Sequence, residues 1–387
     1  MKKVIYIAYA HLSNKVARDW YIDYLRANGI VVEYWDLITL LLGGFKEANT
    51  IEADYVFTPS TYSELGKMLS LLENREAIYV ILICYEGRFT RLFRLLSKYD
   101  CRTYFIAWAN FPIKTLSKWQ QIVRELIINP IRLGGKVVNK VKGVAYKKLK
   151  LVKPFDVVFA AGDATIKMYP DAGKIVPINL VDYDHYVRAK SESRKIVEGP
   201  YAVFLDVYLP YHSDLKVISL QSVDPHNYFF SLNRFFKIFE QEYGIKVIIA
   251  AHPTADYGNN TFEEREIYRG LTPELVKDAD FVISHHSASL GYAVLNSKPI
   301  IFIYTNEMKL LYKNTMTMTL INDVADYLDA NIYNIDEVTQ GDQIVFGSIN
   351  FERYNSYKYN YLTTKESEHT CTQDIIWREL LADWQIS

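Results

Sequence analysis

Three short segments in the second half of the sequence carry residue types suited to transfer chemistry, and each follows an apolar run. Asp206 closes one such run directly before a turn that contains Pro210. A carboxylate at the end of a strand can take the proton from a hydroxyl group and act as a general base. An aspartate that only caps a turn is the alternative, and the residues alone leave both interpretations open.

His252 ends a second apolar run, Val247 to Ala251, and Pro253 then stops the strand. A histidine in this position can donate a hydrogen bond to a departing phosphate, and partial protonation at neutral pH strengthens that bond. The alternative is a structural histidine whose ring is bonded within the fold.

The third segment leads from a predicted strand, Phe281–Ser284, into a loop of small residues that opens a helix. Backbone N–H groups of this loop and the hydroxyls of Ser287 and Ser289 would form a cradle for phosphate, unless the serines only cap the helix. Adjacent side chains in extended backbone point in opposite directions, so one of His285 and His286 should face the ligand and the other should pack. With no acid or cysteine close by in sequence, we expect no metal site.

The elements that must position these residues alternate between short apolar runs and amphipathic segments. We expect strands in the first half at residues 4–10, 30–35, 54–57, 78–84, 104–108 and 156–160, and in the second half at 201–207, 246–251, 281–284 and 299–304. Such alternation is typical of parallel sheets covered on both faces. The predicted fold class is therefore α/β, with two Rossmann-like doubly wound domains facing a cleft and the ligand at the carboxyl ends of the strands.

The length of 387 residues fits two domains of ordinary size. We predict an N-terminal, acceptor-side domain at residues 1–195, a nucleotide-donor-binding domain at residues 200–346, and a tail at residues 347–387 whose helix returns to the first domain. The join between the domains is expected in the polar stretch Val181–Gly199.

One segment, residues 112–153, departs from this pattern because it holds eleven cations and a single acid, Glu125. Apolar residues alternate with the cations at helical spacing, which is typical of a helix that lies on an anionic membrane surface. We expect lysines of this segment to contact the membrane or an anionic lipid-linked acceptor: Lys136, Lys140, Lys142, Lys147 and Lys148. The alternatives are a solvated helix that packs on the sheet and, with no accompanying motif, a nucleic-acid patch.

The whole chain has a formal net charge of −1, so no overall charge attracts it to nucleic acid, and nucleic acid is not an expected partner. Three cysteines at no metal-ligand spacing favour a reduced, cytoplasmic protein. The start of the chain reads as a strand and not as a signal peptide, and the apolar runs fall short of the roughly 20 residues that span a membrane. We expect a cytoplasmic protein, peripheral at the inner face of the membrane.

Taken together, the motifs Leu205-Asp206, His252-Pro253 and Ser287-Ala288-Ser289, followed by Lys298 to Phe302, resemble bacterial surface-carbohydrate glycosyltransferases of the GT-B fold. The resemblance is greatest to those that use CMP-activated sialic acid, Kdo or related nonulosonic acids, and it covers about residues 200–305. The sequence departs from the family at Asp206-Val207-Tyr208 and at Ala288, so the identity of the base and the donor class stay open.

The resemblance implies an inverting, metal-independent transfer without a cofactor. Asp206 would be the base, His252 would assist the leaving nucleotide, and Ser287 and Ser289 would bind its phosphate. Three residues of the preceding loop and helix would lie near the nucleotide base and ribose: Arg269, Thr272 and Glu274.

The expected partners are a nucleotide-sugar donor and a glycan or lipid-linked acceptor. The alternatives are another donor (CDP-glycerol, a UDP- or GDP-sugar), a nucleotide-sugar epimerase, and a non-catalytic scaffold of a glycan assembly complex. Two Asp-x-Asp pairs, Asp182/Asp184 and Asp278/Asp280, are expected to be surface or capping acids.

Overall fold

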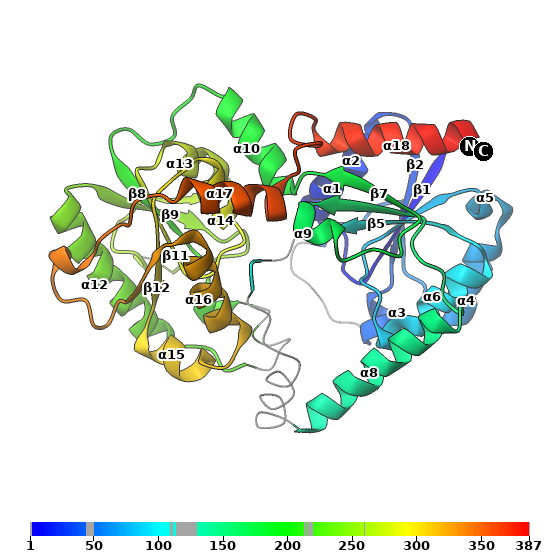
Figure 1. Ribbon diagram of the computed structural model, residues 1–387, viewed down its shortest axis with the longest axis horizontal. Helices are drawn as coiled ribbons and strands as arrows, with labels where there is room; N and C mark the ends of the chain where they lie inside the picture. Colours follow the sequence, from blue (N-terminus) through cyan, green and yellow to red (C-terminus); the bar gives the residue numbers. More distant parts are fainter. Residues whose placement is uncertain are drawn as a thin grey trace.

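The computed structural model describes residues 2–43, 50–108, 111–113, 130–212, 215, 220–258 and 260–386. Two parallel sheets stand next to each other, each with helices on both faces (Figure 1). In both sheets the strand order runs outward from the first strand, with the next two strands on one side and the later ones on the other. This is the doubly wound Rossmann arrangement, so the predicted fold class is confirmed.

The N-terminal sheet has the order β3-β2-β1-β4-β5-β6-β7. Its strands are β1 (Lys3–Ala8), β2 (Val31–Asp36), β3 (Val56–Phe57), β4 (Ile78–Ile81), β5 (Arg102–Ala107), β6 (Val157–Ala161) and β7 (Lys174–Ile178). The helices around it are α1 (Asn14–Asp19), α2 (Ile22–Ala27), α3 (Ile38–Leu42), α4 (Tyr62–Ser70), α5 (Leu72–Arg75), α6 (Thr90–Lys98), α8 (Pro130–Lys148) and α9 (Asp163–Ile166), with a 3-10 turn at Gly87–Phe89. Every residue of β1, β4 and β6 is buried, as expected for strands covered on both faces.

The C-terminal sheet has the order β10-β9-β8-β11-β12-β13. Its strands are β8 (Tyr201–Leu205), β9 (Lys246–Ala251), β10 (Ile267–Arg269), β11 (Phe281–Ser284), β12 (Ile300–Tyr304) and β13 (Asn331–Asn334). The helices are α12 (Pro225–Tyr243), α13 (Thr272–Asp278), α14 (Leu290–Leu295), α15 (Asn306–Tyr312) and α16 (Met316–Leu328), with 3-10 turns at Leu209–Tyr211 and Gly341–Gln343. Strands β8, β9 and β11 are neighbours, so the ends that carry the three predicted motifs meet at one edge of this sheet.

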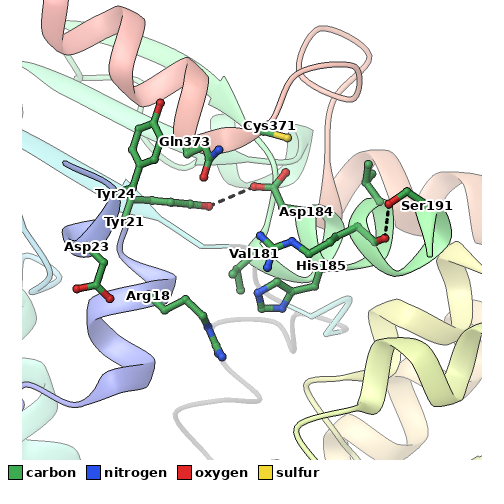
Figure 2. A pocket seen from close by; sticks show the side chains of 12 residues that line it. Arg18, Tyr21, Asp23, Tyr24, Val181, Asp184, His185, Ser191, Cys371 and Gln373 are labelled. Atoms are coloured by element: carbon green, nitrogen blue, oxygen red, sulfur yellow. Dashed lines mark hydrogen bonds between the residues drawn. The ribbon is translucent and has the colours of Figure 1, made fainter. Parts of the chain in front are cut away.

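The predicted polar join at Val181–Gly199 begins with a helix, α10 (Val181–Ser191), that packs on α13 and α14 of the C-terminal domain. Its two acids are not the surface or capping residues that the sequence suggested. Tyr292 donates a hydrogen bond to Asp182 at 3.1 Å, and Tyr21 donates one to Asp184 at 3.2 Å (Figure 2). Both carboxylates therefore lie between structural elements and tie α10 to both domains. In the other pair, Asp280 is exposed and accepts from the backbone N–H of Tyr201, the first residue of β8.

The chain returns to the first domain at its end (Figure 1). Helix α17 (Phe351–Tyr357) continues into a π-helical turn, Lys358–Leu362, and α18 (Thr372–Ile386) then lies on the N-terminal domain. Arg102 bonds both carboxylate oxygens of Asp383 at 2.9 and 2.8 Å, and Leu380 is fully buried in the core of that domain.

Helix α8 occupies the basic segment and contacts the body of the domain through a narrow face. Tyr85 donates a hydrogen bond to the carbonyl of Gly143, and a Cβ on Gly87 would meet the backbone of Asn139. Apolar side chains of α8 remain in solvent, with exposed fractions of 65% for Val138 and 62% for Val141. Residues 114–129 and the side chain of Lys136 lie outside the described part of the chain.

Candidate active site in the interdomain cleft

A cavity of about 420 Å³ opens between the domains at the carboxyl ends of β8, β9 and β11. The N-terminal domain contributes Lys15 and Phe111. The C-terminal domain contributes the polar residues Asp206, His212, His252, Thr272, His286, Ser287, Ser289 and Thr317, together with apolar and glycine residues of the same loops. The cleft therefore gathers side chains that lie more than 250 residues apart in the sequence, at the edge where doubly wound sheets bind ligands.

Asp206 lies at the wall of this cavity with an exposed fraction of 4%. Tyr257 donates a short hydrogen bond to its Oδ2 atom, whereas Oδ1 has no hydrogen-bond partner among the described residues. Burial raises the pKa of Asp206 to about 6, and the hydrogen bond from Tyr257 opposes that shift. A buried carboxylate with one unsatisfied oxygen and a pKa near neutrality is suited to accept a proton from a bound hydroxyl group.

Tyr257 is a positioning residue that sequence reasoning missed. Its ring lies 5.7 Å from the guanidinium of Arg269, whose Nη2 atom donates to the carbonyl of Ala255 at 3.0 Å. Arg269 therefore supports the tyrosine that holds Asp206, and it does not line the cavity. This differs from the nucleotide contact that the resemblance implied for Arg269.

His252 lies on the cleft wall, and Thr254 orients its ring. The Thr254 hydroxyl lies 2.9 Å from Nδ1, and the backbone nitrogen of Thr254 lies 3.3 Å from the same atom. The ring of His212 lies 5.1 Å away, centre to centre. A histidine ring at the end of β9 can donate a hydrogen bond to a phosphate oxygen, which is the chemistry predicted for it.

The two adjacent histidines after β11 have different surroundings. His286 lines the cleft, and its buried Nδ1 atom has no hydrogen-bond partner among the described residues. Burial, and then the nearby His285 and His212, lower the pKa of His286 to about 3, so its ring is neutral. His285 is fully buried and bonds Tyr228 at 2.9 Å and the carbonyl of Ile303 at 2.6 Å. The donor contact expected for His285 is therefore corrected, because its ring has both partners in the core.

Ser287 and Ser289 both lie on the cleft, next to His286. The Ser287 hydroxyl accepts from the backbone N–H of Ser289 at 3.2 Å, and Ser289 is the residue before α14. Ser287 thus acts as a local cap of the loop, which is the alternative that the sequence left open. Because its oxygen accepts in this bond, its O–H proton can still be donated to a ligand. Thr272, the first residue of α13, also lines the cleft.

Glu274 lies one turn into α13 and does not line the cavity. Its buried Oε2 atom has no hydrogen-bond partner among the described residues, and its charge contributes to raising the pKa of Tyr292. Glu274 is thus close enough to Tyr292 to influence it, and the ribose contact that the resemblance implied for Glu274 stays a prediction.

Two cleft residues carried no signal that sequence reasoning used. Lys15 is the single lysine or arginine that lines the cavity within the described chain, and it comes from α1 of the opposite domain. His212 follows the turn at Leu209–Tyr211. Both stand in exposed loops or first helical turns, where residue type alone does not separate a ligand contact from a solvated side chain.

The first domain has its own proton-accepting pair at the carboxyl ends of β1 and β2. His11 Nδ1 lies 2.5 Å from Asp36 Oδ2, and Asp36 is 2% exposed. The ring is thereby oriented, although His11 does not line the described cavity.

Within the described residues, no group of three histidine, cysteine or acidic side chains gathers closely enough to hold a metal ion. The same part of the chain contains no helix that is long and apolar enough to cross a bilayer. The groups that this cleft offers to a ligand are thus hydrogen-bond donors, one lysine and a buried carboxylate.

The chain is similar in structure to proteins with two facing Rossmann-like domains. The wall teichoic acid polymerase TagF (H444N variant) matches with a TM-score of 0.54 and 12% identity, over 99% of this chain and 90% of that one. TagF H444N with CDPG gives 0.50 and 11%, over 100% and 89%. UDP-GlcNAc 2-epimerase from Methanocaldococcus jannaschii gives 0.45 and 11%, over 99% and 100%. No family model and no curated protein matches the sequence.

At this level of identity the likeness defines the fold. The chain has the GT-B architecture, in which two doubly wound domains face each other across a cleft.

Proposed function

We propose that this protein is a glycosyltransferase that moves a sugar from a nucleotide donor to a hydroxyl group of a glycan or lipid-linked acceptor. The observation that carries the proposal is the buried Asp206 carboxylate on the cleft of a GT-B fold. Tyr257 bonds one of its oxygens, and the other has no hydrogen-bond partner in the part of the chain that the structure describes. In the proposed reaction Asp206 accepts the hydroxyl proton as the acceptor oxygen attacks the anomeric carbon. The bond from that carbon to the nucleotide phosphate breaks, with inversion.

The leaving phosphate would meet donors that the cleft already holds. The imidazole of His252 and the hydroxyl of Ser287 lie on the same wall of the cleft. Lys15 adds a positive charge from the opposite domain. These groups stabilise the charge that develops on the phosphate, so the proposal requires no metal ion.

For the donor we propose a CMP-activated nonulosonic acid, such as Kdo or a sialic-acid-like sugar. The support for this finer assignment is the order of the Asp206, His252 and Ser287-Ala288-Ser289 motifs along the chain. The TagF structure matched with CDPG makes a CDP-linked donor the competing assignment.

The test is a thermal-shift titration with CMP, CDP, UMP, UDP, GDP and ADP. A nucleotide at 100 times its dissociation constant stabilises the folded protein by about 2.7 kcal/mol, which gives a readable rise in Tm. We expect CMP to give the largest rise, and His252→Ala to reduce it. The matched control is His226→Ala, because His226 is exposed on α12 and does not line the cleft. A larger rise with CDP would assign a CDP-linked donor instead. No response to any nucleotide would refute the proposed transferase activity.

We further propose that α8 places the protein on an anionic membrane surface. Four lysines lie in the last three turns of α8: Lys140, Lys142, Lys147 and Lys148 are all exposed. In the same part of α8, Val138, Val141 and Val144 are exposed to solvent, although a helix packed only on its own domain would turn them inward. Cations beside exposed apolar residues match a surface of anionic headgroups over acyl chains.

Vesicle co-sedimentation tests this docking. The fourfold Lys→Gln variant of the α8 lysines should lose most binding to vesicles with phosphatidylglycerol, since each lysine contributes about 1 kcal/mol near such a surface. The control changes four exposed lysines elsewhere, Lys67, Lys167, Lys195 and Lys237, to Gln. Equal loss in both variants would show a general charge effect and would contradict the assignment to α8.

A further inference from the structure

Helices α6 and α8 of the N-terminal domain contact each other, and neither contains an acidic residue (Figure 1). Arg91, Arg94 and Lys98 follow one another at intervals of three and four residues, so they lie on one face of α6, and all three are exposed. The other face carries the buried side chains of this helix: Leu92, Phe93 and Leu96. Helix α6 therefore presents a row of positive charge that its packing on the domain does not require.

Tyrosine rings hold these cations in place without neutralising them. The guanidinium of Arg91 lies 4.1 Å from the ring centre of Tyr62, on α4. The guanidinium of Arg94 and the ammonium of Lys142, on α8, lie 5.6 and 6.0 Å from the centre of one and the same ring, that of Tyr146. An aromatic ring attracts a cation through its quadrupole but carries no net charge, so the positive charge remains. We call Arg91, Arg94, Lys142 and Tyr146 the α6–α8 seam.

The three cations of the seam have no acidic partner among the residues that the structure describes. The acids closest to α6 in the sequence are paired elsewhere: Glu86 with Arg88 at 2.7 Å, and Asp100 with Lys153 at 3.1 Å. In the described chain no group accepts a hydrogen bond from either seam arginine, so the N–H groups of both guanidinium ions remain for a ligand. Such planar forks match the oxygens of a phosphate.

Exposed apolar side chains continue the seam along α8. Val138, Lys142 and Tyr146 are four residues apart, so they form one row on the helix. Val138 is 65% exposed, and Leu149, directly after the helix, is 67% exposed. A soluble anion would need the cations alone, whereas a bilayer with anionic headgroups also covers apolar side chains beside them. The combination favours a membrane lipid over a soluble anion.

We propose that the α6–α8 seam binds the phosphate of an anionic phospholipid, with the guanidinium groups of Arg91 and Arg94 as the recognition elements. The lysines of α8 act as point charges, whereas each seam arginine can bond two phosphate oxygens at once. Helix α6 thus joins α8 on the membrane, and the affinity depends on the shape of the arginine side chain as well as on its charge. The inference rests on the membrane docking proposed for α8, and its test separates the two.

The first experiment is co-sedimentation of the full chain with vesicles of phosphatidylglycerol in phosphatidylcholine. The double variant Arg91→Gln, Arg94→Gln should bind about thirtyfold more weakly than wild type, because two cations near an anionic surface are lost. The matched control, Arg194→Gln with Arg378→Gln, removes the same charge from two exposed arginines elsewhere and should bind nearly as wild type does. Equal losses in the two double variants would overturn the site.

The second variant, Arg91→Lys with Arg94→Lys, keeps the charge and removes the fork. We expect it to bind at least about threefold more weakly than wild type, because an ammonium group does not bond two phosphate oxygens in one plane. An unchanged Tm would show that these exposed substitutions leave the fold intact. Wild-type affinity in this variant would overturn recognition by the arginines, and displacement from the vesicles by millimolar inorganic phosphate would overturn the lipid assignment.

Comparison with the fourfold lysine variant of α8 separates this site from the docking proposed above. Loss of binding in the arginine variants alone would remove the lysine contact and support the seam, whereas loss in the lysine variant alone would overturn the seam and leave α8 standing. Neither measurement involves a nucleotide. A protein that binds vesicles through the arginines but binds no nucleotide would therefore fail the proposed transferase activity and keep the seam.

Discussion

Replacement of Asp206 by asparagine separates its catalytic role from its effect on stability. The carboxylate is 4% exposed, and burial raises its pKa from 3.8 to about 6. Because the folded pKa lies above the unfolded one, the folded state binds more protons between these values, and stability falls as the pH rises through that window. At one pKa unit per 1.36 kcal/mol, the ionised carboxylate costs about 3 kcal/mol of folding free energy above pH 6.

Asparagine keeps the size of the side chain and an oxygen that accepts from Tyr257, but it carries no charge. We therefore expect Asp206→Asn to abolish transfer while it raises the free energy of unfolding at pH 7.5, by up to about 3 kcal/mol. The gain should shrink below pH 6 and be mostly lost near pH 4, because the folded carboxyl is then neutral and the unfolded carboxyl has begun to protonate as well.

Chemical denaturation of both proteins at pH 4, 5, 6 and 7.5, beside a transfer assay, provides the measurement. Asp171→Asn is the matched control, because the side chain of Asp171 is exposed. A variant that loses stability at pH 7.5 would refute the argument from burial. A variant that keeps its activity would show that Asp206 is not the general base. The pair His11 and Asp36 on the first domain would then be the next candidate for that role.

Three further substitutions test the structure around the site. Tyr257→Phe removes the hydrogen bond that stabilises the ionised Asp206 carboxylate. The acidic limb of the pH–activity profile should therefore move up by about one pH unit, and an unchanged limb would contradict this role of Tyr257. Gly162 has φ +82°, and a Cβ at this position would clash with the backbone carbonyl of Asn360, so Gly162→Ala should lower the Tm by several degrees. Gly199 has a similar φ of +80° but open space around it, so Gly199→Ala should lower the Tm less. Leu380→Ala leaves a cavity where α18 meets the first domain and should cost 2–5 kcal/mol in chemical denaturation, an amount that a shift below about 1 kcal/mol would contradict.

Periodicity predicted the sheets because buried strands leave a strong pattern. The apolar run before His252 and the strand Phe281–Ser284 have the predicted ends, since Pro253 and a small-residue loop stop them. Helices α1 and α2 are separated at Tyr21, whose φ of 60° no propensity rule would place in a non-glycine residue. Strand β7 escaped notice because Pro177 interrupts its apolar run, and an edge strand tolerates that proline.

The strong pattern of buried strands also explains which cleft residues could be predicted from the sequence. Asp206, His252 and Ser287 each follow a buried strand, so a local pattern fixes where their side chains emerge. Tyr257 and Lys15 depend on tertiary contacts alone. Tyr257 lies 51 residues from Asp206 in the sequence and bonds its carboxylate without lining the cavity, whereas Lys15 lines the cavity from the opposite domain. His285 was misassigned because the alternation after β11 says that one histidine packs but not which one, and only the partners Tyr228 and Ile303 decide it. The sequence pattern at strand ends therefore predicts the cleft residues of the C-terminal domain. It does not predict the residues that support them through tertiary contacts or that line the cleft from the opposite domain.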